Sequence, residues 1–259
     1  MFRSNIQVMQ HLLFKAKLRL VILFLASLSA FAQIPGGDSP AGIGVAMTKL
    51  FGDTKAFTAK ADVQVLDKAQ KETMSMPMDF ALLDDKIRVE IDMTQMKKKD
   101  MPAGATEQIK KMGMAQVISI IRPDRKLIYV IYPDQKCLLT MPLSAEEAEA
   151  AVKMPKIEKT AVGKETIDGH ACVKNKVVIT DDKGQKVEAT TWNATDLKDF
   201  PVQIQSTEKE NTSVVRYKQV QFVKPDAEQF EPPAGYTHYN DQSEMMQGLM
   251  KKMMSGESK

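Results

Sequence analysis

Apolar residues recur at every second position along much of this chain, most regularly between residues 74 and 93. Successive side chains of a β-strand point to opposite faces, so this period predicts strands with one apolar and one polar face. In the second strand the polar positions are Lys86, Arg88, Glu90 and Asp92. The apolar positions that share one face of the two strands are Met74, Met76, Met78, Phe80, Leu82, Ile87, Val89, Ile91 and Met93.

The same period, interrupted by turn residues such as Asp84-Asp85 and Asp168-Gly169, predicts about eleven strands in succession. A meander of this length makes one large antiparallel sheet that either closes into a barrel or stops short as a half-barrel. The predicted strands cover residues 56–67, 72–83, 85–96, 115–122, 125–132, 136–142, 157–166, 170–180, 185–193, 200–209 and 213–224.

Helical spacing predicts short helices between the strands, which typically cover the apolar face of such a sheet. The predicted helices cover residues 41–51, 105–112 and 144–154, the last with a Ser144 cap, and a tail within 240–259 that Asp241 caps. In the tail, Met246, Leu249, Met250 and Met253 share one stripe. The sequence therefore predicts a mainly β (α+β) fold, a curved antiparallel sheet or unclosed half-barrel with covering helices on its concave side.

The N-terminal segment has the composition of a secretory signal peptide, residues 1–32. Four basic residues precede a short apolar run, and Ala30-Phe31-Ala32 gives a small-x-small cleavage site before Gln33. A retained anchor is the alternative. The sequence then predicts a flexible lead-in over 33–40, a single domain over 41–239, and a periplasmic or secreted protein.

Removal of residues 1–32 leaves 32 basic against 33 acidic residues, a net charge of −1. The basic cluster Lys97-Lys98-Lys99 has no interleaved aromatic residues, so nothing favours nucleic acid as a partner. The two cysteines, Cys137 and Cys172, lie in predicted strands. In an oxidising compartment they form either a disulfide or two buried thiols, because pairing depends on a Cα separation that sequence does not reveal.

Catalytic constellations are not evident. The two histidines that follow the signal segment, His170 and His238, stand outside any metalloprotease or nucleophile-elbow motif, and no C-x-x-C occurs. The sequence therefore predicts no enzyme, no cofactor and no metal site built from histidine or cysteine.

Methionine is over-represented, with 18 in the chain. Its unbranched, polarisable side chain adapts to irregular partners, so a methionine-rich sheet face is typical of a packed core or of a surface for a hydrophobic ligand. Thioethers also suit copper(I), but side chains two positions apart on a strand lie about 6.6 Å apart, too far to share one ion without a bend.

Several segments, together with the order of elements, carry a resemblance to a known family. They are Met74-Ser-Met-Pro-Met78, Arg122-Pro-Asp124, Tyr132-Pro133, Gly163 to Cys172 and Phe230 to Tyr236. With them the chain resembles the periplasmic lipoprotein-carrier (LolA/LolB-like) superfamily, and more closely an uncharacterised bacterial secreted family allied to it. The arginine latch of those carriers has no matching motif here.

The resemblance implies a hollow that holds lipid or lipoprotein acyl chains, lined by the nine residues of the shared apolar face, with Met246 and Met250 on a lid. The expected function is a non-enzymatic binding protein for a lipid or other hydrophobic ligand. Two alternatives stay open. One is an interaction module with a filled core, whose envelope protein partner docks on an edge strand or on the tail, and the other is a methionine-based copper(I) handler.

Overall fold

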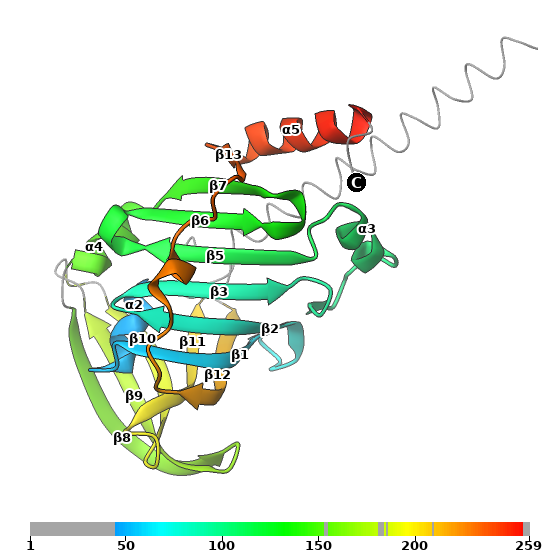
Figure 1. Cartoon of the computed structure of the whole chain (residues 1–259). Helices are drawn as coiled ribbons and strands as arrows, with labels where there is room; N and C mark the ends of the chain where they lie inside the picture. Colours follow the sequence, from blue (N-terminus) through cyan, green and yellow to red (C-terminus); the bar gives the residue numbers. More distant parts are fainter. Residues whose placement is uncertain (1–44, 153–154, 181–183, 185, 209, 256–259) are drawn as a thin grey trace, which may run out of the picture. The chain divides into compact units, whose positions relative to one another are not determined.

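The computed structural model describes residues 45–152, 155–180, 184, 186–208 and 210–255. They form one 13-stranded curved sheet that does not close into a barrel (Figure 1). All eleven predicted strands are present, together with the short strands β4 and β13. The strands are β1 (Ala56–Leu66), β2 (Glu72–Leu83), β3 (Lys86–Asp92), β4 (Lys97–Lys98), β5 (Gln116–Arg122), β6 (Leu127–Tyr132), β7 (Cys137–Pro142), β8 (Lys156–Ile167), β9 (His170–Thr180), β10 (Lys186–Ala194), β11 (Phe200–Glu208), β12 (Asn211–Gln221) and β13 (Thr237–Tyr239).

The strand order corrects the prediction of a single meander. It runs β13-β7-β6-β5-β3-β2-β1-β12-β11-β10-β9-β8, so β7 and its successor in sequence, β8, lie at opposite ends of the sheet. The sheet consists of two meanders joined by the antiparallel pairing of β1 with β12, in which Val63 lies opposite Val215. The described strands pair antiparallel except β13, which runs parallel to β7.

Turn chemistry explains where the strands reverse. Asp84 and Asp85 have φ angles of 48° and 66°, the left-handed conformation that a tight hairpin between β2 and β3 requires. Two later hairpins repeat one design, in which a one-turn 3-10 helix begins with proline and is followed by a left-handed lysine, Lys126 or Lys136. The sequence pattern Pro-Asp-x-Lys at both places is the signal for this turn.

The helices are short and are capped as predicted. The amide of Glu147 donates to Ser144 Oγ (3.1 Å), and the amide of Glu244 donates to Asp241 Oδ1 (2.8 Å). The helical elements are α2 (Val45–Thr48), η2 (Lys49–Phe51), α3 (Ala105–Lys111), α4 (Ala145–Val152), η5 (Ala227–Phe230) and α5 (Gln242–Ser255).

Three predictions lie outside the described residues: the signal peptide over 1–32, the lead-in over 33–40 and the first turn of the helix over 41–51. Within the described residues, no helix has the length and apolar character needed to cross a membrane.

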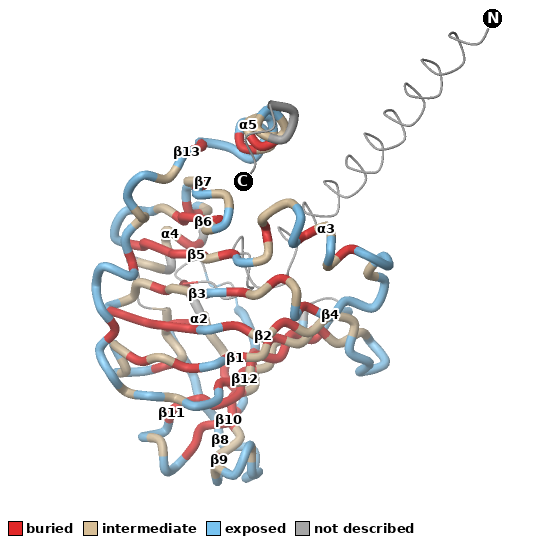
Figure 2. Tube along the Cα trace, turned by 45° about the vertical axis from the view of Figure 1, so that its right-hand side comes forward, coloured by how far each residue is buried: buried red, intermediate tan, exposed pale blue. Residues whose placement is uncertain are grey.

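A segment that we call the strap, residues 222–236, crosses the outer side of the sheet from the end of β12 to β13 (Figure 1). Its Phe230 is fully buried in a second core on that side, against Ile120, Tyr129, Ile131 and Leu138. The strap explains why β6 is continuously apolar and why most of β5 is buried, since both of their faces are covered, as the buried stretches in Figure 2 show.

Candidate functional site

Eight of the nine predicted lining residues lie together on one face of the sheet, which we call the inner face, and the ninth, Met93, follows the end of β3. Residues directly opposite each other in an antiparallel pair point to the same side, so the pairing register assigns them. Three rows of paired residues cross the strands: Phe57–Leu82–Ile87–Ile121–Ile128, Phe80–Val89–Ser119–Val130–Leu139, and Tyr217–Ala61–Met78–Ile91–Val117.

Burial agrees with this assignment. Eight of the nine residues are at most 7% exposed, and only Met74, near the end of β2, is half-buried. The intervening polar residues of β3 occupy the outer face, where Glu90 lies opposite Asp79. The predicted division into an apolar and a polar face is therefore confirmed for β3, whereas the outer face of the neighbouring strands carries the second apolar core beneath the strap.

Aromatic rings fill one end of the inner face. Phe51 of η2 stacks on Phe200 of β11, with ring centroids 5.5 Å apart, and contacts Phe57, Phe80 and Tyr217 at 5.0–6.0 Å. The predicted first helix therefore covers this end of the sheet. Phe51, Phe200 and Tyr217 did not enter the predicted lining, although Val215 and Tyr217 follow the same two-residue alternation.

Methionines fill the other end. Met76 on β2, Met93 after β3, Met96 before β4 and Met114 before β5 are all buried, and Ile109 of α3 is buried with them in this part of the fold. On the inner face, the register thus places Met74 and Met76 of β2 at the end away from the rings of Phe57 and Phe80. Met74 and Met76 lie opposite Val65 and Val63 of β1, spaced along one strand, and the copper(I) alternative stays a prediction.

The C-terminal helix lies against β13 at the edge of the sheet (Figures 1 and 2). Its buried residues are Met245 and Leu249, whereas the predicted Met246 and Met250 are half-buried. Leu249 of the predicted stripe is therefore buried as expected, whereas Met245 is buried in place of Met246, and the lid role of Met246 and Met250 stays a prediction.

Two arginines fasten the strap to the outer face. Arg122, only 3% exposed, donates two hydrogen bonds to Asp124 (2.9 and 2.7 Å), one to the carbonyl of Phe230 (3.1 Å) and one to Glu231 (2.5 Å). Arg88 donates to the carbonyl of Gln229 (2.8 Å). The motif at Arg122-Pro-Asp124 thus meets the motif that begins at Phe230, although 108 positions separate them.

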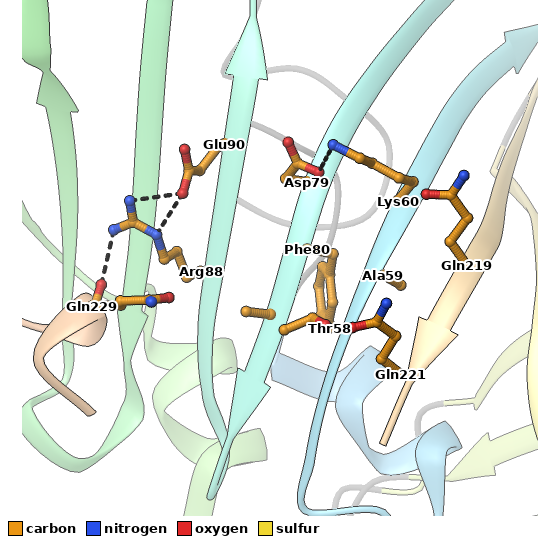
Figure 3. Close-up of a pocket in the computed structure, with 11 residues that line it drawn as sticks. Thr58, Ala59, Lys60, Asp79, Phe80, Arg88, Glu90, Gln219, Gln221 and Gln229 are labelled. Carbon is orange, nitrogen blue, oxygen red and sulfur yellow. Dashed lines mark hydrogen bonds and ion pairs between the residues drawn. The ribbon is translucent and has the colours of Figure 1, made fainter. Parts of the chain in front are cut away.

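A polar pocket of about 260 Å³ lies on the outer face beside the strap (Figure 3). Its charges are paired internally: Lys60 with Asp79, and Arg88 with Glu90 at 2.8 Å. A β-bulge in the pairing of β1 with β12 and a left-handed Gln219 (φ 51°) border it.

The histidines take structural partners. His170 Nδ1 lies 2.7 Å from Asp196 Oδ2 in the exposed turn region, and His238 contacts Thr140 on the neighbouring strand. Within the described part of the chain, no group of three or more histidine, cysteine or acidic residues is placed to hold a metal ion.

The cysteines are free and buried in this structure, so it contains no disulfide between Cys137 and Cys172. They belong to β7 and β9, and eight strands lie between these two in the sheet order. Burial raises the pKa of both thiols.

A family model described as Domain of unknown function (DUF4412) matches residues 63–200. No curated protein matches the chain.

Among solved structures, the chain is similar to a LolA superfamily protein from Nitrosomonas europaea, with 10% identity, a TM-score of 0.37, and coverage of 72% of this chain and 94% of that chain. It is also similar to the lipoprotein LppX from Mycobacterium tuberculosis (14% identity, TM-score 0.38, 68% and 93% covered). A third similar structure is LprF from Mycobacterium bovis (12% identity, TM-score 0.37, 70% and 94% covered).

Proposed function

We propose that this chain, which belongs to the family described as Domain of unknown function (DUF4412), is a non-enzymatic periplasmic protein that binds a lipid or another hydrophobic ligand on its inner face. The observation that carries the proposal is the gradient along that face. Rigid aromatic rings pack one end against η2, and methionines gather at the other end near α3. Methionine side chains repack around partners of varied shape, which a lipid-binding surface requires.

The driving force would be removal of apolar chains from water. Burial of one CH2 group is worth about 0.8 kcal/mol, so a twelve-carbon chain gains roughly 9 kcal/mol before the costs of association. An open sheet suits this task because a ligand can reach the inner face from an uncovered edge. That edge is β8, the last strand of the sheet, whose side chains are almost all exposed.

Native mass spectrometry of the protein purified from a periplasmic extract, followed by organic extraction, tests the proposal. We expect a discrete added mass that extracts as lipid. The variant Met74→Glu places a charge on the inner face at a half-buried position that tolerates it, and it should lose the added mass. Ser75→Glu is the matched control, because the neighbouring residue on the same strand is also half-buried but points outward, and it should keep the added mass.

A wild-type protein that shows only its own mass, also after incubation with lipids, would contradict the proposal. In that case the inner face is filled core, and the interaction module with an envelope protein partner becomes the better hypothesis. Loss of the added mass in both variants would show that the introduced charge destabilises the protein and does not block a ligand on the inner face specifically.

A further inference from the structure

Three hydroxyl groups on the inner face have no hydrogen-bond partner among the described residues: Ser119 Oγ, Ser213 Oγ and the phenol oxygen of Tyr217. All three side chains are buried, with exposures of 1%, 7% and 2%. Their cross-strand partners are Val89, Val65 and Ala61, so each hydroxyl-bearing side chain lies on the same apolar face as the predicted lining.

Other buried polar side chains in this sheet, unlike these three hydroxyls, are hydrogen-bonded to one another. Asn175 and Thr191 both donate to Asn193 Oδ1, at 3.0 and 2.7 Å, and Asn193 donates in turn to the carbonyl of Asp199 at 2.7 Å. A buried tyrosine usually finds a partner for its hydroxyl, because desolvation of an unpaired donor is not recovered in folding. An unpaired buried hydroxyl needs an explanation, and a bound molecule that accepts its hydrogen bond is one.

Tyr217 is the best defined of the three. The rings of Phe51, Phe57, Phe80 and Phe200 surround it with centroid distances of 5.5–6.2 Å, which fixes the direction of its hydroxyl. Burial raises its pKa, so the phenol stays protonated and is a hydrogen-bond donor. The three inner rows contain no lysine or arginine, so an uncharged acceptor suits this environment better than a carboxylate.

We propose that Tyr217 is the residue that recognises the polar group of the ligand, by donating a hydrogen bond to the carbonyl oxygen of an ester- or amide-linked acyl chain. This inference rests on the proposed function and narrows its ligand class. The apolar rows bind the hydrocarbon chain, and the phenol distinguishes an acylated lipid from an alkyl chain without a carbonyl.

A pair of lipids that differ only in that carbonyl tests the inference. 1-Lauroylglycerol has an ester carbonyl, and 1-O-dodecylglycerol has the same chain length and headgroup without it. With calorimetric titration at monomeric lipid concentrations, we expect the wild-type protein to prefer the ester by roughly three- to tenfold, the value of one neutral hydrogen bond. Tyr217→Phe should abolish this preference and leave the affinity for the ether unchanged.

Tyr129→Phe is the matched control, because Tyr129 belongs to the outer core beneath the strap, and it should keep the preference. Urea unfolding of the lipid-free protein gives a second readout. Tyr217→Phe should be at least as stable as wild type, since it removes an unpaired buried donor, whereas a structural role for the hydroxyl would lower the midpoint.

The outcomes separate the two proposals. Equal ester preference in wild type and Tyr217→Phe, or binding of both lipids with no preference, overturns the role of Tyr217 and leaves hydrophobic binding intact. Failure of the wild-type protein to bind either lipid overturns the proposed function and this inference together.

Discussion

Truncation of Phe230 to alanine should weaken the whole fold, although the residue belongs to an irregular segment. Phe230 is 0% exposed and packs in the outer core, where Ile120, Ile131 and Leu138 surround it. Phe→Ala changes at fully buried sites lower the free energy of unfolding by about 3–5 kcal/mol, because the protein loses both the transfer free energy and the packing around the cavity. In a domain of this size we expect a melting temperature lower by on the order of 10 °C.

Urea unfolding followed by circular dichroism measures the global effect, and limited proteolysis of the strap measures local detachment. Val223→Ala is the control, since Val223 is 50% exposed in the same segment, and its effect should stay within about 0.5 kcal/mol. If Phe230→Ala lowered the free energy of unfolding by less than about 1 kcal/mol, the reasoning would be refuted, because removal of a fully buried ring from a well-packed core costs more than that. Faster proteolysis of the strap without global destabilisation would show that the strap opens independently of the sheet.

Two further predictions concern titratable groups. The hydrogen bond from Arg122 lowers the pKa of Asp124 in the folded state, so this pair stabilises the protein fully above the ordinary carboxyl pKa of about 4 and loses its contribution below it, as the pH falls through the lowered pKa. The difference in urea midpoint between wild type and Asp124→Asn should therefore be largest near neutral pH and shrink toward about pH 2, and a difference that grows on acidification would contradict the assignment. Cys137 and Cys172 are buried thiols with raised pKa, so a thiol reagent should label neither in the native protein and both in denaturant; no labelling in denaturant would reveal a disulfide.

Local structure was largely predictable because its causes are local. The two-residue period between residues 74 and 93, with the turn at Asp84-Asp85, fixes both the strands and the face of each side chain. The caps at Ser144 and Asp241 likewise act within one helical turn, and both are present. Such signals need no knowledge of distant contacts.

Long-range arrangement was not predictable from the same patterns. The sequences of β1 and β12 carry no signal that these two strands pair with each other. The prediction of a single meander was therefore wrong. The burial of β5 and β6 on both faces was not predicted, because the strap that covers their outer face lies about 100 positions further along the chain. Arg122 and Phe230 stood in segments noted for their family resemblance, and only the fold brings those segments into contact. In α5, Leu249 of the expected stripe is buried, but Met245 is buried in place of Met246.

The seam between β1 and β12 also has a consequence for how the chain reaches its fold. Most neighbouring strands within each meander are joined by short turns, although β4 and α3 lie between β3 and β5. Hairpins form in about 1–10 μs, whereas the seam pairs Val63 with Val215, 152 positions further along the chain. Closing so long a loop is entropically unfavourable and slow, so we expect both half-sheets to form before they join. In that interval β1 and β12, central in the finished sheet, are edge strands with unpaired backbone groups. Aggregation during refolding should therefore begin at these two strands, although neither is an edge in the folded protein.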